Sequence, residues 1–396
     1  MNETYLRGFK IRLFPSKEQE ELMWKHIHAS RFVYNKCKEI RDNAYKVESK
    51  KIKEFDMINK LPELKGEYRF LKEVSNATLQ VTIRDLYFAY KMFFRKISGY
   101  PKFKSKKKDK KSFPLTQDGN KTYFRNNKYV KLPKIGDVYY RFDYRKDYHI
   151  VSYIFHNPRV VYANNKWILS VGLECEKQTR EPTYKRMGID LGIEYLATVS
   201  FGNDYECEEV QYVNINKDPK MKKNESKIRY LQRKLSRQRN ANKDIIDKTK
   251  KDTNNMEKTK KKLQKAYYRQ HCIRTDYMHK LSCYFVYYQK PLCITMETLK
   301  SSNMVKNRHL AKAIQDASFY TFTHMIKYKC EWTTDIGFMQ VPTNYPSSKR
   351  CSKCGNIKRD LKLKDRVYVC DKCNNELNRD INAARNLRDY EYNKHA

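Results

Sequence analysis

The sequence predicts a multidomain protein of mixed α/β and α+β class. Its 396 residues suffice for two or three domains with cores of their own. Aromatic and β-branched residues alternate as in strands over 113–175, and apolar residues recur at helical spacing on both sides of that segment. Two CxxC pairs near the C-terminus are separated by 15 residues, which is typical of a small zinc-binding module.

The N-terminal segment predicts one strand followed by two helices. The strand covers 5–13, and Ser16 with Gln19 forms the pattern of a capping box that begins a helix. A second helix is expected after Ser75. Each helix carries an apolar stripe at helical spacing. The stripes consist of Leu22, Ala29, Val33, Cys37 and Ile40 in the first helix and Leu79, Ile83, Leu86, Tyr90, Phe93 and Ile97 in the second.

A basic run, KFKSKKKDKKSF, occupies residues 102–113. A solvated loop and a phosphate-binding loop both fit this composition, because a loop that is mobile alone can become ordered on a nucleic-acid backbone. The strands that follow, over 113–175, predict a small antiparallel barrel. The helical block is therefore expected to be an insertion between the first strand and this barrel. The candidate nucleic-acid contacts of the run are Lys102, Lys104, Lys106, Lys107 and Lys108.

The second half predicts two strands, a basic helical hairpin, and further strands and helices. RMGIDLGIEYLATVSF contains two strands joined by a tight turn, and PLCITMETL is a short buried strand. The hairpin covers about 221–288 with an interruption near 251–255. Its apolar positions are so sparse that we expect it to lie across a partner. A helix around 310–325, a strand near 338–341 and a final helix complete this part.

The charge of the chain indicates a polyanionic partner. Lys and Arg number 84 against 45 Asp and Glu, which gives a formal net charge of +39. A nucleic acid can offset such an excess, because each phosphate that is neutralised releases counterions. A membrane surface is the rival polyanion, but no apolar run approaches the roughly 20 residues of a spanning helix. The composition therefore favours a nucleic-acid-binding protein.

The cysteines predict one structural Zn²⁺ site in a reducing compartment. Cys351, Cys354, Cys370 and Cys373 supply four thiolates from two tight turns, as a tetrahedral zinc site requires. The remaining seven of the 11 cysteines have no pairing pattern, which suits buried thiols. Because the N-terminus also lacks the apolar segment of a signal peptide, we expect a cytoplasmic protein.

Three carboxylates form a candidate catalytic site: Asp190, Glu297 and Asp380. Each has a simpler interpretation, as a turn residue, a strand-end residue and a first-turn helix acid respectively. Asp190, however, lies in an apolar strand where an unpaired charge is costly, and Gly188 and Gly192 leave space for a phosphate and metal. Together the three carboxylates could hold two Mg²⁺ ions about 4 Å apart for phosphodiester hydrolysis.

The order of these motifs resembles the TnpB proteins of insertion sequences, which are relatives of compact type V CRISPR effectors. The resemblance covers nearly the whole chain. It includes an N-terminal segment, KIRLFPSKEQEELMWKHIHASRFVYNK, and the later motifs YPKFKSKKKDKKSF, KLPKIGDV, GIDLGIEYLATVS, METL, QDASF, YPSSKRCSKCG and NRDINAARNL. One departure is Asn374, where relatives usually carry glycine after the fourth cysteine. Asparagine also tolerates a left-handed turn, so zinc binding is expected to persist.

The resemblance implies an RNA-guided DNA endonuclease of a transposable element. Its fold would combine a wedge-type β-barrel (1–15 and 113–182) with a helical recognition insert (16–112). A RuvC-like RNase H fold (183–346 and 376–396) would contain a zinc ribbon (347–375). Asp190, Glu297 and Asp380 occupy the catalytic positions of the family, and the implied partners are a guide RNA and double-stranded target DNA, with one protein monomer per RNA.

The resemblance also implies protein contacts to a short motif beside the DNA target. Asn76 and Gln80 are candidates, because either amide can pair with adenine in a major groove. An exposed polar residue at a helix start is the alternative interpretation of both.

Other functions remain open at this point. They are a nuclease-inactive RNA-guided DNA-binding repressor, a compact type V CRISPR effector and a strand-exchanging transposase. The three retained carboxylates argue against the repressor. The sequence contains no glycine-rich phosphate loop, which argues against an ATP-driven motor or ligase.

Overall fold

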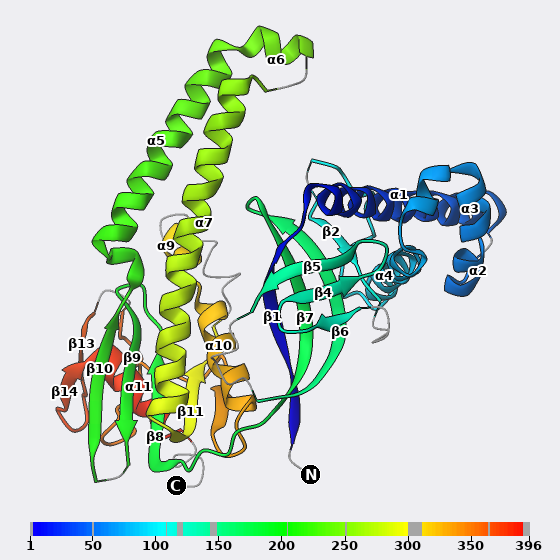
Figure 1. The fold of residues 1–396 in the computed structure, drawn as a ribbon. Coiled ribbons are helices and arrows are strands. Elements are labelled where there is room, and N and C mark those ends of the chain that lie inside the picture. Colours follow the sequence, from blue (N-terminus) through cyan, green and yellow to red (C-terminus); the bar gives the residue numbers. More distant parts are fainter. Residues whose placement is uncertain are drawn as a thin grey trace. The chain divides into compact units, whose positions relative to one another are not determined.

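The computed structural model describes residues 3–49, 51–107, 109–116, 122–142, 149–203, 205–249, 252–299, 311–362 and 365–390. The chain divides into two compact units, Met1–Glu176 and Lys177–Ala396 (Figure 1). Lys108, a candidate nucleic-acid contact, lies outside the described residues.

The first unit begins with a strand and a group of helices. The capping box predicted at the first helix is confirmed, since the Gln19 amide donates to the Ser16 hydroxyl at 3.2 Å and the Ser16 amide donates to the Gln19 side chain at 3.0 Å. These elements are β1 (Thr4–Phe14), α1 (Lys17–Glu48), α2 (Glu54–Asn59), α3 (Leu61–Glu67), the 3-10 helix η1 (Arg69–Glu73) and α4 (Asn76–Phe94). Their apolar stripes meet in one core, in which Val33, Cys37 and Leu86 are fully buried.

A seven-stranded antiparallel sheet completes the first unit. Its further strands are β2 (Lys111–Pro114), β3 (Tyr123–Arg125), β4 (Tyr129–Leu132), β5 (Gly136–Arg141), β6 (Ile150–Ala163) and β7 (Lys166–Glu176), in the order β2-β6-β7-β1-β5-β4-β3. β1 pairs with both β5 and β7, and α1 to α4 lie in sequence between β1 and β2, two strands of the same sheet. Among the described strands no pairing joins β2 to β3, and the closed barrel remains a prediction.

The second unit is built on a mixed sheet of five strands. They are β8 (Thr183–Asp190), β9 (Tyr195–Gly202), β10 (Cys207–Val213), β11 (Pro291–Glu297) and β12 (Gly337–Val341). The order is β10-β9-β8-β11-β12, with β8, β9 and β10 antiparallel and β11 parallel to both β8 and β12. The sequence did not predict β10.

Helices cover the two faces of this sheet. The core on one face combines side chains of β8, β9 and β11 with those of α7 (Asn254–Cys283), α9 (Ala311–Ala317) and α10 (Phe319–Glu331). A single helix was predicted around 310–325, but Ser318 separates α9 from α10 with a left-handed φ of 55°. The final helix, α11 (Arg379–Arg388), packs against β8, β9 and β11 from the other face.

The predicted basic hairpin is confirmed. α5 (Pro219–Ala241) and α7 run side by side, and α6 (Lys243–Thr249) lies between them in sequence (Figure 1). A short π-helical turn, Tyr284–Tyr288, follows α7. Within the described part of the chain, no helix combines the length and apolar composition needed to cross a membrane.

A small hairpin separates β12 from α11. It consists of β13 (Val367–Val369) and β14 (Glu376–Asn378), which pair with each other alone. The four predicted zinc ligands lie before and between these two strands, and the chain leaves β14 directly into α11.

Candidate active site and metal centre

Asp190 and Glu297 lie side by side at the ends of two neighbouring parallel strands. β8 ends at Asp190 and β11 at Glu297, and the register pairs the preceding residues, Ile189 and Met296. Ile189 and Met296 are fully buried in the core with α7 and α10. Because side chains alternate across a strand, the two carboxylates lie on the opposite face of the sheet, which α11 covers.

The third carboxylate, Asp380, lies in the first turn of α11, where Asn378 caps the helix by accepting from the Asp380 amide at 2.9 Å. The backbone of α11 packs so closely on β8 that a Cβ added at Gly188 would overlap the Ala384 carbonyl and the Arg388 amide. The expectation that Gly188 leaves space for a phosphate is therefore wrong. That space holds a helix, and the helix brings Asp380 to the other two carboxylates.

The electrostatics of the site link the three carboxylates directly. Burial raises the pKa of the Asp190 carboxyl well above its usual range, and the charges of Glu297 and Asp380 raise it further. Burial also raises the pKa of Glu297, and Asp380 adds to this effect, while Ser347 and Arg379 act against it. Closely placed carboxylates disfavour each other's ionised form. The site therefore has an excess of negative charge that a cation would relieve.

Among the described residues, Arg379 is the cation nearest to Asp380. Its guanidinium lies 3.3 Å from Asp380 Oδ1, with a side chain that is 15% exposed, and its charge also lowers the pKa of Asp190 and of Glu297. Arg366 is more distant, 3.8 Å from Asp380 Oδ2, and largely exposed. Arg379 thus compensates part of the charge without neutralising all three carboxylates.

A polar network holds the loop before the zinc ligands against this site. The Ser347 hydroxyl donates to Glu297 Oε1. Asn386 of α11 donates to the Ser347 carbonyl at 2.8 Å and to the Arg350 carbonyl at 2.6 Å, and Asn382 donates to the Arg350 carbonyl at 2.7 Å. Both asparagines are buried. α11 therefore fixes both Asp380 and the serine that contacts Glu297.

The four predicted zinc ligands come together. The Sγ atoms of Cys351, Cys354, Cys370 and Cys373 all lie within 4.8 Å of one another, and the closest pairs are 3.5 and 3.7 Å apart. Tetrahedral zinc with Zn–S bonds of about 2.3 Å needs sulfur separations of roughly 3.8 Å. The four thiols therefore suit a zinc site.

In each CxxC turn, the residue after the second cysteine has a left-handed backbone conformation. Gly355 has a φ of 75° and Asn374 a φ of 53°, and each donates its amide to the carbonyl of the first cysteine of its pair, Cys351 or Cys370, at 2.9 and 3.0 Å. The left-handed turn predicted at Asn374 is confirmed.

The carboxylates are spaced more widely than the thiols. Within the described residues, the cysteines are the group of three or more potential ligands whose donor atoms all lie within 4.8 Å of one another. Asp190, Glu297 and Asp380 do not form such a compact group. Their oxygens are hard ligands of the type that Mg²⁺ prefers. This spacing, together with the raised pKa values of Asp190 and Glu297, fits cations that would bind between the side chains.

The predicted nucleic-acid residues of the first unit differ in availability. Asn76 begins α4 and is exposed, although its side chain accepts from Lys65 Nζ at 2.6 Å, and Gln80 is half-buried. Lys102, Lys106 and Lys107 are exposed. Lys104 instead places its Nζ 3.8 Å from the centre of the Tyr34 ring.

Lys104 is also partly withdrawn from solvent. Desolvation lowers the pKa of Lys104, and its backbone is fixed by Asn35, to whose side chain its amide donates at 2.7 Å. This lysine is accordingly the least available of the described group for a phosphate contact.

Three family models match segments of the chain. They are "Helix-turn-helix domain" over residues 1–51, "Probable transposase" over 170–308 and "Cas12f1-like, TNB domain" over 319–387. The last match covers the zinc-ligand cysteines and Asp380. Fold and site together thus define an α/β protein with a four-thiol cluster that is related to transposon-encoded proteins.

Curated relatives identify the family. A "Putative RNA-guided DNA endonuclease" of Streptomyces pristinaespiralis is 30% identical over 98% of this chain and 90% of its own length. The protein of the same name from Escherichia coli K12, InsQ, is 30% identical over 96% and 91%. The chain belongs to the TnpB family, as its motifs predicted. A solved Cas12f1–sgRNA–target DNA complex aligns at 14% identity over 98% of this chain and 100% of its own, with a TM-score of 0.34.

Proposed function

We propose that this protein is an RNA-guided DNA endonuclease of a transposable element, in which Asp190, Glu297 and Asp380 form the catalytic site. The observation that carries the proposal is the convergence of these carboxylates from β8, β11 and α11 in a TnpB family member. The charges of Glu297 and Asp380 raise the pKa of Asp190, which indicates that the three carboxylates lie close enough to share cations.

The carboxylates would hold Mg²⁺. When bound there, Mg²⁺ would promote attack of water on the phosphodiester and stabilise charge on the leaving oxygen. Ser347 orients Glu297 by donating to one of its oxygens, which leaves the other oxygen for the ion. Arg379 supplies a fixed positive charge beside Asp380, where it can attract a phosphate of the DNA strand.

The architecture supports a RuvC-like RNase H fold for the second unit. The strand order is β10-β9-β8-β11-β12, with Asp190 and Glu297 at the ends of the adjacent parallel strands β8 and β11 and Asp380 on α11. The zinc-binding hairpin would act as a target nucleic-acid-binding ribbon with structural Zn²⁺. In the first unit, the sheet would be the wedge-type domain and α1 to α4 the recognition insert, with Asn76 and Gln80 as candidates for contacts to the target-adjacent motif.

The partners would be a guide RNA and double-stranded target DNA, with one protein chain per RNA. The named activities of the S. pristinaespiralis and E. coli relatives support both nucleic acids, and the net charge of +39 supplies the attraction to their phosphates. Base pairing with the guide would select the target sequence.

A nuclease-inactive, RNA-guided repressor is the rival function. It would bind the same partners without needing the carboxylates. Bringing three acids together at a half-buried site is costly, and such a cost is reasonable for a site that binds cations. The retained triad therefore favours the nuclease.

The experiment is to express the protein with its native flanking DNA and sequence the RNA that copurifies. A defined RNA with a variable 3′ segment supplies the target for a cleavage assay with Mg²⁺. Cleavage of matched but not mismatched DNA would support the proposal. Heterogeneous RNA, together with cleavage that ignores the guide, would contradict it.

A further inference from the structure

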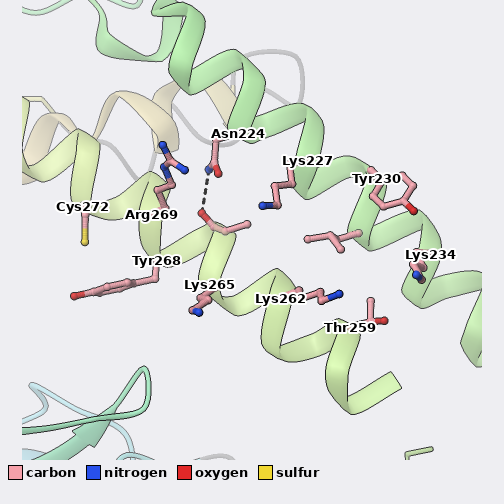
Figure 2. Close-up of a pocket in the computed structure, with 12 residues that line it drawn as sticks. Asn224, Lys227, Tyr230, Lys234, Thr259, Lys262, Lys265, Tyr268, Arg269 and Cys272 are labelled. Atoms are coloured by element: carbon pink, nitrogen blue, oxygen red, sulfur yellow. Dashed lines mark hydrogen bonds between the residues drawn. The ribbon is translucent and has the colours of Figure 1, made fainter. Parts of the chain in front are cut away.

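The two long helices of the basic hairpin enclose a groove. It has a volume of about 750 Å³ and is lined by side chains of α5 and α7 (Figure 2). Its floor is apolar, since Leu231 and Ala266 are each 5% exposed and pack with Ile228 and Leu263. Asn224 fixes the separation of the helices by donating to the Ala266 carbonyl at 3.0 Å.

All charged residues that line the groove are basic. Lys227 and Lys234 come from α5, and Lys262, Lys265 and Arg269 come from α7, whereas no carboxylate is among the lining residues (Figure 2). All five cations are exposed. Within the described part of the chain, none of the five is in an ion pair.

Other cations near or on the same helices do have acidic partners. Arg274 pairs with Asp316 at 2.9 Å and Lys280 with Asp276 at 2.8 Å. Within the described residues, other exposed cations of these helices, such as Lys222 and Lys258, also have no ion pair. The groove is distinguished by its lining, because five cations and no carboxylate share one concave surface, and this suits an anionic ligand from outside the chain.

The arrangement suits an extended anion. Lys227 and Lys234 are seven residues apart, as are Lys262 and Arg269, so each row spans about 10 Å along its helix at a rise of 1.5 Å per residue. Two such rows contact successive charges of a chain better than one small anion. Tyr230, which is 57% exposed on the rim, adds a ring on which a base can stack.

We infer that this groove binds the phosphodiester backbone of a nucleic-acid strand, with Lys227, Lys234, Lys262, Lys265 and Arg269 as the phosphate contacts. The inference rests on the proposed function, which supplies two sources of such a strand, the guide RNA and the target DNA. The groove would hold a strand at a place separate from the carboxylates, without a role in the chemistry.

The test compares two variants with equal loss of charge. The groove variant carries Lys227→Gln, Lys234→Gln, Lys262→Gln and Lys265→Gln. The control carries Lys222→Gln, Lys223→Gln, Lys258→Gln and Lys261→Gln, which are exposed positions of the same helices that do not line the groove. Circular dichroism and thermal unfolding establish that both variants retain the fold.

Binding is measured on the full-length protein with labelled single-stranded RNA, single-stranded DNA and poly-glutamate over a range of salt concentrations. Loss of four phosphate contacts should reduce the slope of log K against log salt by roughly 3 and weaken binding at least about tenfold. The control should change binding by much less. A larger effect on RNA assigns the groove to the guide, and a larger effect on DNA assigns it to the target.

Two results would overturn the inference. One is an equal loss of binding in the groove and control variants, which would indicate diffuse charge. The other is an equal dependence of poly-glutamate binding on the groove, which would indicate a general polyanion site. Because these assays do not require guided cleavage, their results can be interpreted even if the protein is not a nuclease.

Discussion

The Ser347 hydroxyl donates a hydrogen bond to the Glu297 carboxylate, although 50 residues separate them in sequence. Ser347 belongs to the loop that leads into the first zinc-ligand pair, and Asn386 of α11 holds its carbonyl. One buried serine therefore forms hydrogen bonds to both Glu297 and α11, and it lies in the loop that leads to the zinc hairpin.

Replacing Ser347 by alanine should impair the proposed metal site without unfolding the protein. Glu297 would lose the donor that orients it, and removing such a supporting hydrogen bond typically costs about 10- to 100-fold in metal affinity or activity. Cleavage should be measured as a function of Mg²⁺ concentration. Ser348→Ala is the matched control, since the contact of that residue to α11 is through its carbonyl, and an equal loss there would contradict the role of Ser347.

Gly188→Ala should destabilise the second unit. The added Cβ would overlap the backbone of α11 at Ala384 and Arg388, and a helix backbone cannot yield as a flexible side chain can. We expect a loss of about 1–3 kcal/mol in the free energy of unfolding, measured by denaturant titration. Gly8→Ala in β1 has open space around the new Cβ and should be much milder. Equal effects would refute the close packing of α11 on β8.

Asp190→Asn should stabilise the protein in Mg²⁺-free buffer, increasingly so as the pH rises. The folded state raises the pKa of Asp190 above its ordinary value of 3.8. Between pH 3.8 and the raised pKa of the folded state, the folded chain keeps a proton on Asp190 that the unfolded chain has lost. The free energy of unfolding therefore falls as the pH rises through this range and then levels off. Asparagine avoids this loss.

The measurement for this substitution is the difference in melting temperature between variant and wild type across pH, without chelators that remove zinc. Added Mg²⁺ should stabilise the wild type more than the variant. A wild type that gains stability over the variant as the pH rises would show that the three carboxylates do not repel each other.

Cys370→Ser should abolish stoichiometric zinc binding and lower thermal stability. Cys370 is fully buried within the thiol cluster, and the binding free energy of a structural zinc site contributes directly to folding. Metal content after gel filtration and the melting temperature report both effects. Cys272→Ser, at an exposed thiol of α7, should retain zinc, and zinc retained by Cys370→Ser would argue against the four-thiolate site.

Local patterns predicted much of this fold. The capping box at Ser16, the basic hairpin and the cysteine cluster follow from short-range spacing, and the structure contains all three. The three carboxylates could be selected because an acid in an apolar strand is conspicuous. Their proximity, however, depends on strand order, which the sequence pattern alone does not determine.

The features that sequence reasoning missed depend on distant contacts. β10 carries Glu209, whose carboxylate accepts from Arg385 of α11 at 2.8 Å. Because such polar residues interrupt the apolar alternation typical of strands, the sequence pattern did not indicate β10. The hydrogen bonds of Ser347 and Asn386 join segments that are 36 or more residues apart. The spacing of Asn382 and Asn386, one turn apart on a buried helix face, was the available signal for this network.

The most direct test of the proposed active site is guided DNA cleavage by Asp190→Ala. We expect cleavage to fall at least about a thousandfold, because several kcal/mol of metal-dependent charge stabilisation is lost. RNA binding and guided DNA binding should stay within about twofold of the wild type. Glu194→Ala, at an exposed acid a few residues later, should cleave normally. Cleavage by Asp190→Ala at the wild-type rate would contradict the assignment of the catalytic site.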